Sequence, residues 1–432
     1  MFKKIISLLL VTVFTLTFAI PVFAEKDKEI TTIDEIVLSF ENPNGRVLCV
    51  AKYGNPRLFP ENSLEGISSA ATLGADIVSI CAQQTKDRQL ILLSSDDLSI
   101  WCVNKGDNTT AKGKVSDYTL AELKDKFLLK EGSGGVDAKP TKYSICSLAE
   151  AIETSTKNVM LLVTNGWKYR EAINAVARNY DACNKIIIGG ATDSADIQLF
   201  INQTDTPICH ISATYTTSMK EPVKKFVPST LKSGAKMVKL QSEKSYSSIF
   251  NSSVLSKFDD IGRAFISTTS PSQCGGKDDL IATWDDLIVR GYSVIETDYP
   301  KEFAKYIETV ESYRTDLTTL ITQAKAINTS KYTKESNTAL NDSLKEAERI
   351  AATGCISLHQ IDKARYDIQE SLDSLTVKTG DEKTGLSIWA KLGLFIISLF
   401  LILILIVLGL RFYNKRRRQK SIWIDSKRNL LM

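Results

Sequence analysis

Histidine is almost absent from this chain: the 432 residues include only His210 and His359. One lies in a strand-like run and the other in a helical segment, so no histidine pair is available for acid–base chemistry. The sequence also lacks a glycine-rich turn of the dinucleotide-binding type. The net charge is only +4 at pH 7, and this near balance argues against nucleic acid as a partner.

Apolar segments mark both ends of the chain. Residues 1–24 start with a basic pair, continue as an apolar run and end at Ala24, which is typical of a secretory signal peptide. A retained anchor is the alternative, and the short run disfavours it. Residues 386–411 carry no charge between Lys391 and Arg411, and at about 1.5 Å per residue such a run crosses a bilayer core of about 30 Å.

A basic tail, residues 412–432, follows the second apolar segment. Positive residues stay on the cytoplasmic side of a membrane. The sequence therefore predicts a single-pass protein of the cell membrane, with extracellular N-terminal domains and a cytoplasmic tail.

The eight cysteines are scattered singly along the chain. Several fall in apolar, strand-like runs, where cysteine behaves as a small hydrophobic residue. Although the chain looks exported, we therefore expect no disulfide framework. The cysteines are Cys49, Cys81, Cys102, Cys146, Cys183, Cys209, Cys274 and Cys355.

A polar leader, residues 25–45, precedes a region that alternates strand-like and helical patterns over residues 46–305. The strand-like runs are 46–51, 76–82, 89–94, 158–164, 185–189, 207–211, 236–240, 263–267 and 292–296. Amphipathic helical stretches between them are 63–73, 119–126, 147–155, 167–179 and 281–290. Repeated βα units over about 250 residues favour a TIM (β/α)8 barrel. A doubly wound open sheet is the alternative, and no nucleotide-binding turn supports it.

Residues 306–378 have apolar positions three and four residues apart, which predicts three amphipathic helices folded on one another. The pairs Ala324-Lys325, Tyr332-Thr333 and Glu335-Ser336, followed by Leu340 and Ala347, resemble the FIVAR module of Gram-positive surface proteins. This resemblance implies a spacer or a module that binds cell-wall glycans, and a stalk that lifts the barrel off the membrane is the simpler interpretation. Residues 379–385 read as a polar linker.

Short motifs between Arg46 and Lys124 point to a particular barrel. They are Gly54, Pro60-Glu61-Asn62-Ser63, Gly74-Ala75-Asp76, Thr85-Lys86-Asp87, Gly113 and Val115-Ser116-Asp117. In this order they resemble the glycerophosphodiester phosphodiesterase family, a TIM barrel of the PLC-like phosphodiesterase type. The closing Thr297-Asp298-Tyr299-Pro300 matches the end of that barrel. The resemblance implies hydrolysis of a phosphodiester by two histidines and a divalent metal, Ca or Mg, on three carboxylates.

The acid–base positions of that family are substituted here. Lys52 stands where the resemblance places the first histidine, and Tyr53 replaces the arginine that follows it. Ser94 stands at the second histidine position. No side chain at these positions matches the family's proton-transfer groups.

The metal positions are substituted as well. Ser79 and Cys81 replace the two carboxylates of the second strand, and Leu162 replaces the third. Leu162 offers no oxygen ligand to a hard cation. We therefore predict that the family's activity is lost and that no cofactor is bound, a divalent metal being needed only if catalysis survives.

Four residues remain as candidates for a different site. Lys52 could hold a phosphate as a point charge and Tyr53 could contact a sugar, or Lys52 could simply extend into solvent from a pocket that has lost its role. Glu296 and Asp298 form a new Glu-x-Asp whose side chains share one face of the last strand and could hold a cation. Asp298 already belongs to the structural pattern of the family, so only Glu296 is new.

The sequence supports three functional hypotheses. The first is a non-catalytic binding or structural role at the cell envelope, with a glycerophosphodiester, a lipid head group or a wall polymer such as teichoic acid as ligand. The second is an active phosphoric diester hydrolase of lipid metabolism with a rebuilt site. The third is a protein–protein scaffold, because a fold alone does not fix a function.

Overall fold

The computed structural model describes residues 32–203, 206–242, 247–258, 260–269 and 278–378. The predicted signal peptide, linker, membrane segment and tail lie outside these residues. In the described part, no helix is both long and apolar enough to span a bilayer. The described residues fall into two compact units, one within Met1–Ala326 and Asp342–Glu370 and one within Ile327–Asn341 and Ser371–Met432.

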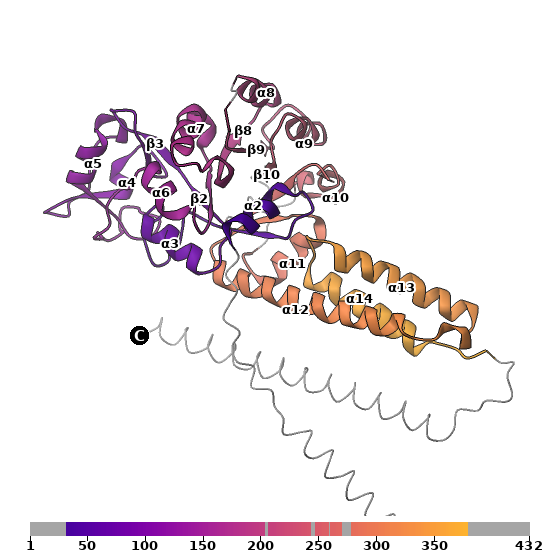
Figure 1. Ribbon diagram of the computed structural model, residues 1–432. Helices are drawn as coiled ribbons and strands as arrows, with labels where there is room; N and C mark the ends of the chain where they lie inside the picture. The colour runs from indigo at the N-terminus through magenta and orange to yellow at the C-terminus, as the bar shows by residue number, and fades with distance from the viewer. Residues whose placement is uncertain (1–31, 204–205, 243–246, 259, 270–277, 379–432) are drawn as a thin grey trace, which may run out of the picture. The chain divides into compact units, whose positions relative to one another are not determined.

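Eight parallel strands close into a barrel in the order β1-β12-β11-β10-β9-β8-β7-β2 (Figure 1). The predicted (β/α)8 fold is therefore confirmed. The strands are β1 (Leu48–Ala51), β2 (Ile77–Ile80), β7 (Met160–Val163), β8 (Ile186–Ala191), β9 (His210–Thr216), β10 (Met237–Gln241), β11 (Arg263–Ser267) and β12 (Val294–Thr297). All but one of the nine predicted strand-like runs belong to this barrel.

The exception is the run 89–94, which was expected to resemble the others. Its strand β4 (Leu90–Leu92) pairs antiparallel with β3 (Ala82–Gln84) outside the barrel. The barrel position next to β2 is taken by β7. A short apolar run has the same pattern in either place, so the sequence did not distinguish them.

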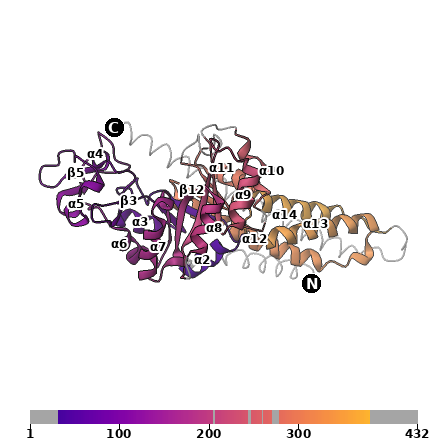
Figure 2. The same cartoon turned by 90° about the horizontal axis from the view of Figure 1, so that it is seen from above.

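An insertion between β4 and β7 builds a small core of its own. It contains α4 (Leu98–Trp101), β5 (Cys102–Asn104), η1 (Val115–Asp117), α5 (Leu120–Lys126) and β6 (Phe127–Leu129). Leu98, Val115 and Leu123 are fully buried within it. Both views place α4 and α5 at the edge of the barrel remote from α10 (Figures 1 and 2).

Helices cover the outside of the barrel (Figure 2). Ser147 caps α6 reciprocally with Glu150, a pairing that fixes where this helix begins. Apolar residues of α3, α6 and α7 bury against the outward faces of the strands. The outer helices are α3 (Leu64–Thr72), α6 (Leu148–Ser155), α7 (Arg170–Asn179), α8 (Ser194–Asn202), α9 (Val223–Lys232), α10 (Ser252–Leu255) and α11 (Ile281–Arg290).

Residues 25–45, expected as a polar leader, contain the helix α2 (Ile33–Glu41). Ile36, Val37 and Phe40 of this helix are buried in one cluster with barrel-interior residues such as Leu48 and Met160. Helix α2 therefore closes the N-terminal end of the barrel, while the other end carries the loops that follow each strand.

The helix α12 (Pro300–Lys325) begins immediately after β12 and runs without a break through the predicted domain boundary at residues 305–306. Its Phe303 stacks edge-on against Trp284 of α11, with ring centroids 5.0 Å apart. The helices α13 (Lys334–Ala352) and α14 (Leu358–Asp373) follow it. Arg314 of α12 donates hydrogen bonds to the carbonyls of Ala351 and Thr353, so the first helix of the predicted module is also the last helix of the barrel.

The second unit is small in its described part. It contains η6 (Thr329–Lys331), and Tyr332 forms an isolated antiparallel bridge with Val377. The Thr333 amide donates to the Thr376 carbonyl at 2.8 Å. These hydrogen bonds tie residues 329–333 to residues 376–378.

Candidate functional site

Polar side chains gather at the C-terminal ends of the barrel strands, where catalytic residues of (β/α)8 enzymes lie. Lys52 follows β1, Ser79 lies on β2, and Glu296 lies on β12. In the register of the sheet, Val50 pairs with Glu296 and Ser267 pairs with Glu296 from the other side. The sequence places Glu296 and Asp298 on one face of the last strand, but β12 ends at Thr297, so only Glu296 lies on the strand and Asp298 follows it.

Lys239 of β10 is the main partner of Glu296. Its Nζ lies 3.5 Å from Glu296 Oε2, and the Glu296 side chain is only 4% exposed. Lys239 Nζ also lies 4.9 Å from the centroid of the Phe265 ring. Burial acts to raise the pKa of Glu296, but Lys239, hydrogen bonds from Ser267 and Ser79, and the charge of Lys52 together hold it below its ordinary value.

Lys239 was missed by the sequence analysis. The signal was present, since Lys239 is the one charged residue within the run Met237–Leu240. A charge in a buried strand generally needs a partner, because an unpaired charge in the interior is costly. The partner lies 57 positions later in the sequence, at Glu296, so only the closed barrel reveals the pair.

Lys52 occupies the mouth of the barrel among several carboxylates. Its amide donates to the Thr297 carbonyl at 3.4 Å, and its Nζ lies 5.6 Å from the centroid of the Tyr53 ring. The charge of Lys52 acts to lower the pKa of Glu61, Glu296 and Asp298. The predicted cation and the predicted carboxylates therefore do come together.

Tyr53 has a left-handed backbone, with φ of 52°. Its amide donates to Ser79 Oγ at 3.2 Å, and its side chain shares a hydrogen bond with Cys81. Burial raises the pKa of Tyr53. Tyr53 thus covers the positions where the family resemblance places carboxylates on the second strand.

The three predicted metal positions do not fit a divalent cation. Ser79 Oγ is used by the Tyr53 amide and the Ala51 carbonyl. Cys81 Sγ lies 3.0 Å from Thr164 Oγ1, and burial raises the pKa of Cys81. Leu162 is 1% exposed and pairs with Ser79 in the sheet.

A hard cation requires several oxygen ligands, preferably carboxylates. These positions instead supply a hydroxyl, a protonated thiol and an apolar side chain. Within the residues that the structure describes, no three His, Cys, Asp or Glu side chains are grouped to hold a metal ion. Glu296, the candidate ligand, is paired with the Lys239 ammonium group instead.

Ser94, at the second histidine position, belongs to a network with the Pro-Glu-Asn motif. Its hydroxyl donates to Glu61 Oε1, and Asn62 Nδ2 donates to Ser94 Oγ at 2.9 Å. Asn62 Oδ1 in turn accepts from the Cys81 amide at 2.8 Å. Burial raises the pKa of Glu61, while Ser94, Ser133 and Lys52 oppose this increase.

Asp279 is a second residue that the sequence analysis missed. Its carboxylate accepts hydrogen bonds from Thr268 Oγ1 at 2.7 Å, Trp284 Nε1 at 2.8 Å, Thr297 Oγ1 at 2.8 Å and the Asp298 amide at 2.7 Å. These bonds hold the end of β12 in place. Burial raises the pKa of Asp298, against the charge of Lys52.

The histidines lie elsewhere in the barrel and its extension. His210 begins β9, at the end of the barrel that α2 closes, and its Nε2 lies 3.5 Å from Glu41 Oε1. His359 is an exposed residue of α14. Neither residue belongs to the cluster around Lys52 and Glu296.

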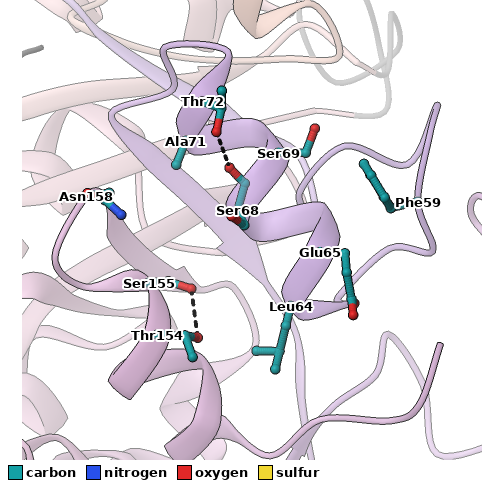
Figure 3. Close-up of a pocket in the computed structure, with 10 residues that line it drawn as sticks. All are labelled: Phe59, Leu64, Glu65, Ser68, Ser69, Ala71, Thr72, Thr154, Ser155 and Asn158. Atoms are coloured by element: carbon teal, nitrogen blue, oxygen red, sulfur yellow. Dashed lines mark hydrogen bonds between the residues drawn. The ribbon is translucent and has the colours of Figure 1, made fainter.

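A groove opens on the outer layer of the barrel, between α3 and α6 (Figure 3). Hydroxyl groups of both helices line it, and the close-up shows Thr72 bonded to Ser68 and Thr154 to Ser155. Phe59 and Leu64 add an apolar margin. None of the predicted site residues lines this groove.

Comparisons with known proteins relate this chain to one protein family. The model of the family described as glycerophosphoryl diester phosphodiesterase matches residues 54–273. A glycerophosphodiester phosphodiesterase of Caldanaerobacter subterraneus subsp. tengcongensis is 32% identical over 80 residues, which are 18% of this chain and 30% of that protein. The chain thus matches less than a third of that relative's length.

Two solved structures of phosphodiesterases contain a similar barrel. A glycerophosphoryl diester phosphodiesterase from Parabacteroides distasonis has 22% identity and a TM-score of 0.49, over 65% of this chain and 93% of that one. A glycerophosphodiester phosphodiesterase from Thermotoga maritima has 18% identity and a TM-score of 0.43, over 60% and 98%. The family match covers about half of the sequence, and this chain belongs to the glycerophosphoryl diester phosphodiesterase family.

Proposed function

We propose that this chain is a non-hydrolysing member of its family that binds a phosphate-bearing ligand at the mouth of its barrel. One observation carries the proposal: the positions where the family resemblance requires metal-binding carboxylates hold none, while Lys52 and the buried Lys239–Glu296 pair lie at the same end of the barrel. Lys239 neutralises Glu296, while Ser79 and Leu162 stand at metal positions. Phosphate binding without a metal requires cations of the protein itself, and lysine is well suited to that role.

The carboxylates at the mouth do not cancel the charge of Lys52 permanently. Burial raises the pKa of Glu61 and of Asp298, so both take up a proton more readily than an exposed carboxyl group. An approaching phosphate favours that protonation further, because like charges repel. The proposal therefore predicts that the affinity for the phosphate-bearing ligand rises as the pH falls from 7 towards 5.

The ligand class is a glycerophosphodiester, a lipid head group or a wall polymer with phosphodiester links. The location of the protein is inferred from the sequence pattern, with residues 1–24 as a signal peptide and 386–411 as a single membrane span. The barrel then lies outside the cell and the basic tail inside. Antibody access to epitope tags placed after residue 25 and after residue 432 on intact cells tests this topology, and a tail reached without permeabilisation would contradict it.

Calorimetry on the purified full-length chain tests the binding proposal. We expect saturable binding of glycerophosphodiesters in excess chelator, weakened at least tenfold by Lys52→Ala. Lys157→Ala is the matched control, because the exposed Lys157 precedes β7 at the opposite end of the barrel. Equal affinity of wild type and Lys52→Ala, or no binding at all, would contradict the proposal.

A rebuilt hydrolase is the second candidate function, and the raised pKa of Glu61 and of Asp298 favours it. A general acid needs a carboxyl group whose pKa lies above its ordinary value, and burial shifts both groups in that direction. Release of glycerol 3-phosphate from several diesters, with calcium, magnesium or chelator, separates the two functions. Metal-dependent turnover that disappears in Glu296→Ala would establish the hydrolase, whereas no turnover above a heat-inactivated control supports binding alone.

A further inference from the structure

Cys183 and Cys209 lie at the start of two neighbouring barrel strands. Cys183 opens the short helix η3 (Cys183–Lys185), which leads directly into β8. Cys209 immediately precedes β9, and Ile187 of β8 pairs with His210 of β9. Both thiols therefore belong to the N-terminal end of the barrel, whereas Lys52 and Glu296 lie at the other end.

Cys183 Sγ lies beside the residues that lead into Cys209, and each thiol shifts the pKa of the other through a side-chain hydrogen bond. Asn174 of α7 fixes the backbone beside them, since its Oδ1 accepts from the Cys209 amide at 2.8 Å and its Nδ2 donates to the Pro207 carbonyl at 3.4 Å. Cys183 Sγ lies 3.6 Å from the same carbonyl. The pair is thus held together by packing and hydrogen bonds before any reaction.

The two members of the pair differ from each other and from the other cysteines. The hydrogen bond from Cys209 lowers the pKa of Cys183 to about 7 despite its burial, and the charge of Arg178 contributes. Burial raises the pKa of Cys102 and of Cys146 to about 12. Cys183 retains 8% exposure, while Cys209 retains 1%.

We propose that Cys183 and Cys209 form a redox-active dithiol that closes into a disulfide when a disulfide oxidant, small or protein-borne, reaches the molecule. The Cys183 thiolate attacks the oxidant, forming a mixed disulfide and releasing one thiolate. Cys209 then loses its proton and attacks Cys183 Sγ, forming the intramolecular bond and releasing the second thiol. The two cysteines lose two electrons, and the oxidant is reduced to two thiols.

Their roles follow from access and acidity. Cys183 attacks first because a thiolate is the nucleophile and Cys183 is the more exposed of the two residues. Cys209 resolves the intermediate because it already touches Cys183. Closing the bond would link η3 to the start of β9 and shorten the loops available to the unfolded chain, which stabilises the fold.

Peptide mapping of the full-length chain tests the proposal. The reduced protein is treated with oxidised glutathione at pH 7, quenched with acid, alkylated and digested with trypsin. Trypsin separates residues 179–185, which contain Cys183, from residues 186–220, which contain Cys209. We expect these peptides to be joined by a disulfide, with Cys102 and Cys146 alkylated only after unfolding.

Variants identify the order of the steps. Cys209→Ser should accumulate glutathione on Cys183, and Cys183→Ser should leave Cys209 unmodified. Cys146→Ser is the matched control and should form the same cross-link as wild type. A rise in the thermal midpoint of unfolding on oxidation should occur in wild type and Cys146→Ser, and be absent from both pair variants.

Alkylation of both cysteines after oxidant treatment would overturn the proposal, as would a wild-type glutathione adduct on Cys183 that Cys209 never displaces. A cross-link from either residue to another cysteine would overturn it equally.

Discussion

Lys239 Nζ and Glu296 Oε2 face each other inside the barrel at 3.5 Å, and they come from strands on either side of β11. We expect Lys239→Met to destabilise the fold by about 3–5 kcal/mol, because it leaves a buried carboxylate unpaired. Urea unfolding measures the change. The double variant Lys239→Met, Glu296→Gln should recover most of the loss, and a double variant no more stable than Lys239→Met would contradict the pairing.

The same pair gives the stability a pH dependence. The pKa of Glu296 is lower in the folded chain than its ordinary value of 4.5, so its contribution is present above pH 4.5 and is lost as the pH falls through the folded pKa. In Glu296→Gln this part of the acid-induced loss should be missing. Unfolding curves between pH 6 and 3 check this, and parallel profiles for variant and wild type would refute it.

Arg263 is a buried cation that binds carbonyl groups instead of a carboxylate. It donates to the carbonyls of Ser39, Asn42 and Arg46 and to both oxygens of Ser293. We expect Arg263→Lys to lower the free energy of unfolding by about 3 kcal/mol. A lysine ammonium group cannot reproduce the planar set of guanidinium N–H donors, so buried carbonyls are left unpaired. Arg349→Ala is the control, since its pair with Glu346 is exposed and should change stability by less than about 1 kcal/mol.

His210 should weaken the fold in mild acid. Burial lowers the pKa of His210, although Glu41 opposes this and Lys236 adds to it. The unfolded chain therefore binds a proton that the folded chain resists, so stability falls as the pH drops through about 6.5, by at most about 1.4 kcal/mol per pH unit.

The slope of unfolding free energy between pH 7.5 and 5.5 measures this effect. We expect a shallower slope in His210→Gln and an unchanged slope in His359→Gln, because His359 is exposed. An equal reduction in both variants would show that the buried histidine is not the cause.

Gly354 lies directly against the loop after α2. A Cβ at this position would come within 2.1 Å of the Asn44 carbonyl oxygen and 2.9 Å of Gly45 C, which are backbone atoms that cannot turn aside. We expect Gly354→Ala to destabilise the chain by about 1–3 kcal/mol through overpacking. Thermal unfolding of Gly354→Ala and of the neighbouring variant Thr353→Ala, at a half-buried residue, tests this. Equal midpoints for the two variants would contradict the close approach.

Much of the barrel could be predicted from local sequence. Strand-like runs such as 236–240 and 263–267 match β10 and β11, and the capped stretch that begins after Ser147 is α6. Hydrophobic periodicity and capping residues depend on residues only a few positions apart, so they can be recognised from the sequence alone. The helix α2 was missed because residues 25–45 look polar overall, although Ile36, Val37 and Phe40 share one face.

The candidate site was predicted in part for the same reason. Lys52, Tyr53 and Glu296 could be named because each stands in or near a motif. Lys239 and Asp279 lie outside the motifs, and their roles in the site depend on partners far away in the sequence. The contact between Cys183 and Cys209 likewise exists only because β8 and β9 are neighbours.

The sequence by itself determined the (β/α)8 architecture, because composition and short-range pattern carry that information, and it predicts the loss of the family's histidines and carboxylates at the motif positions. Only the tertiary structure decided which charges neutralise each other and which thiols touch. Closing eight strands into a barrel brings residues from distant segments within a few ångströms, where burial makes an unpaired charge costly and a paired one stable. That proximity is absent from the linear order of residues, and it sets the chemistry of both ends of this barrel.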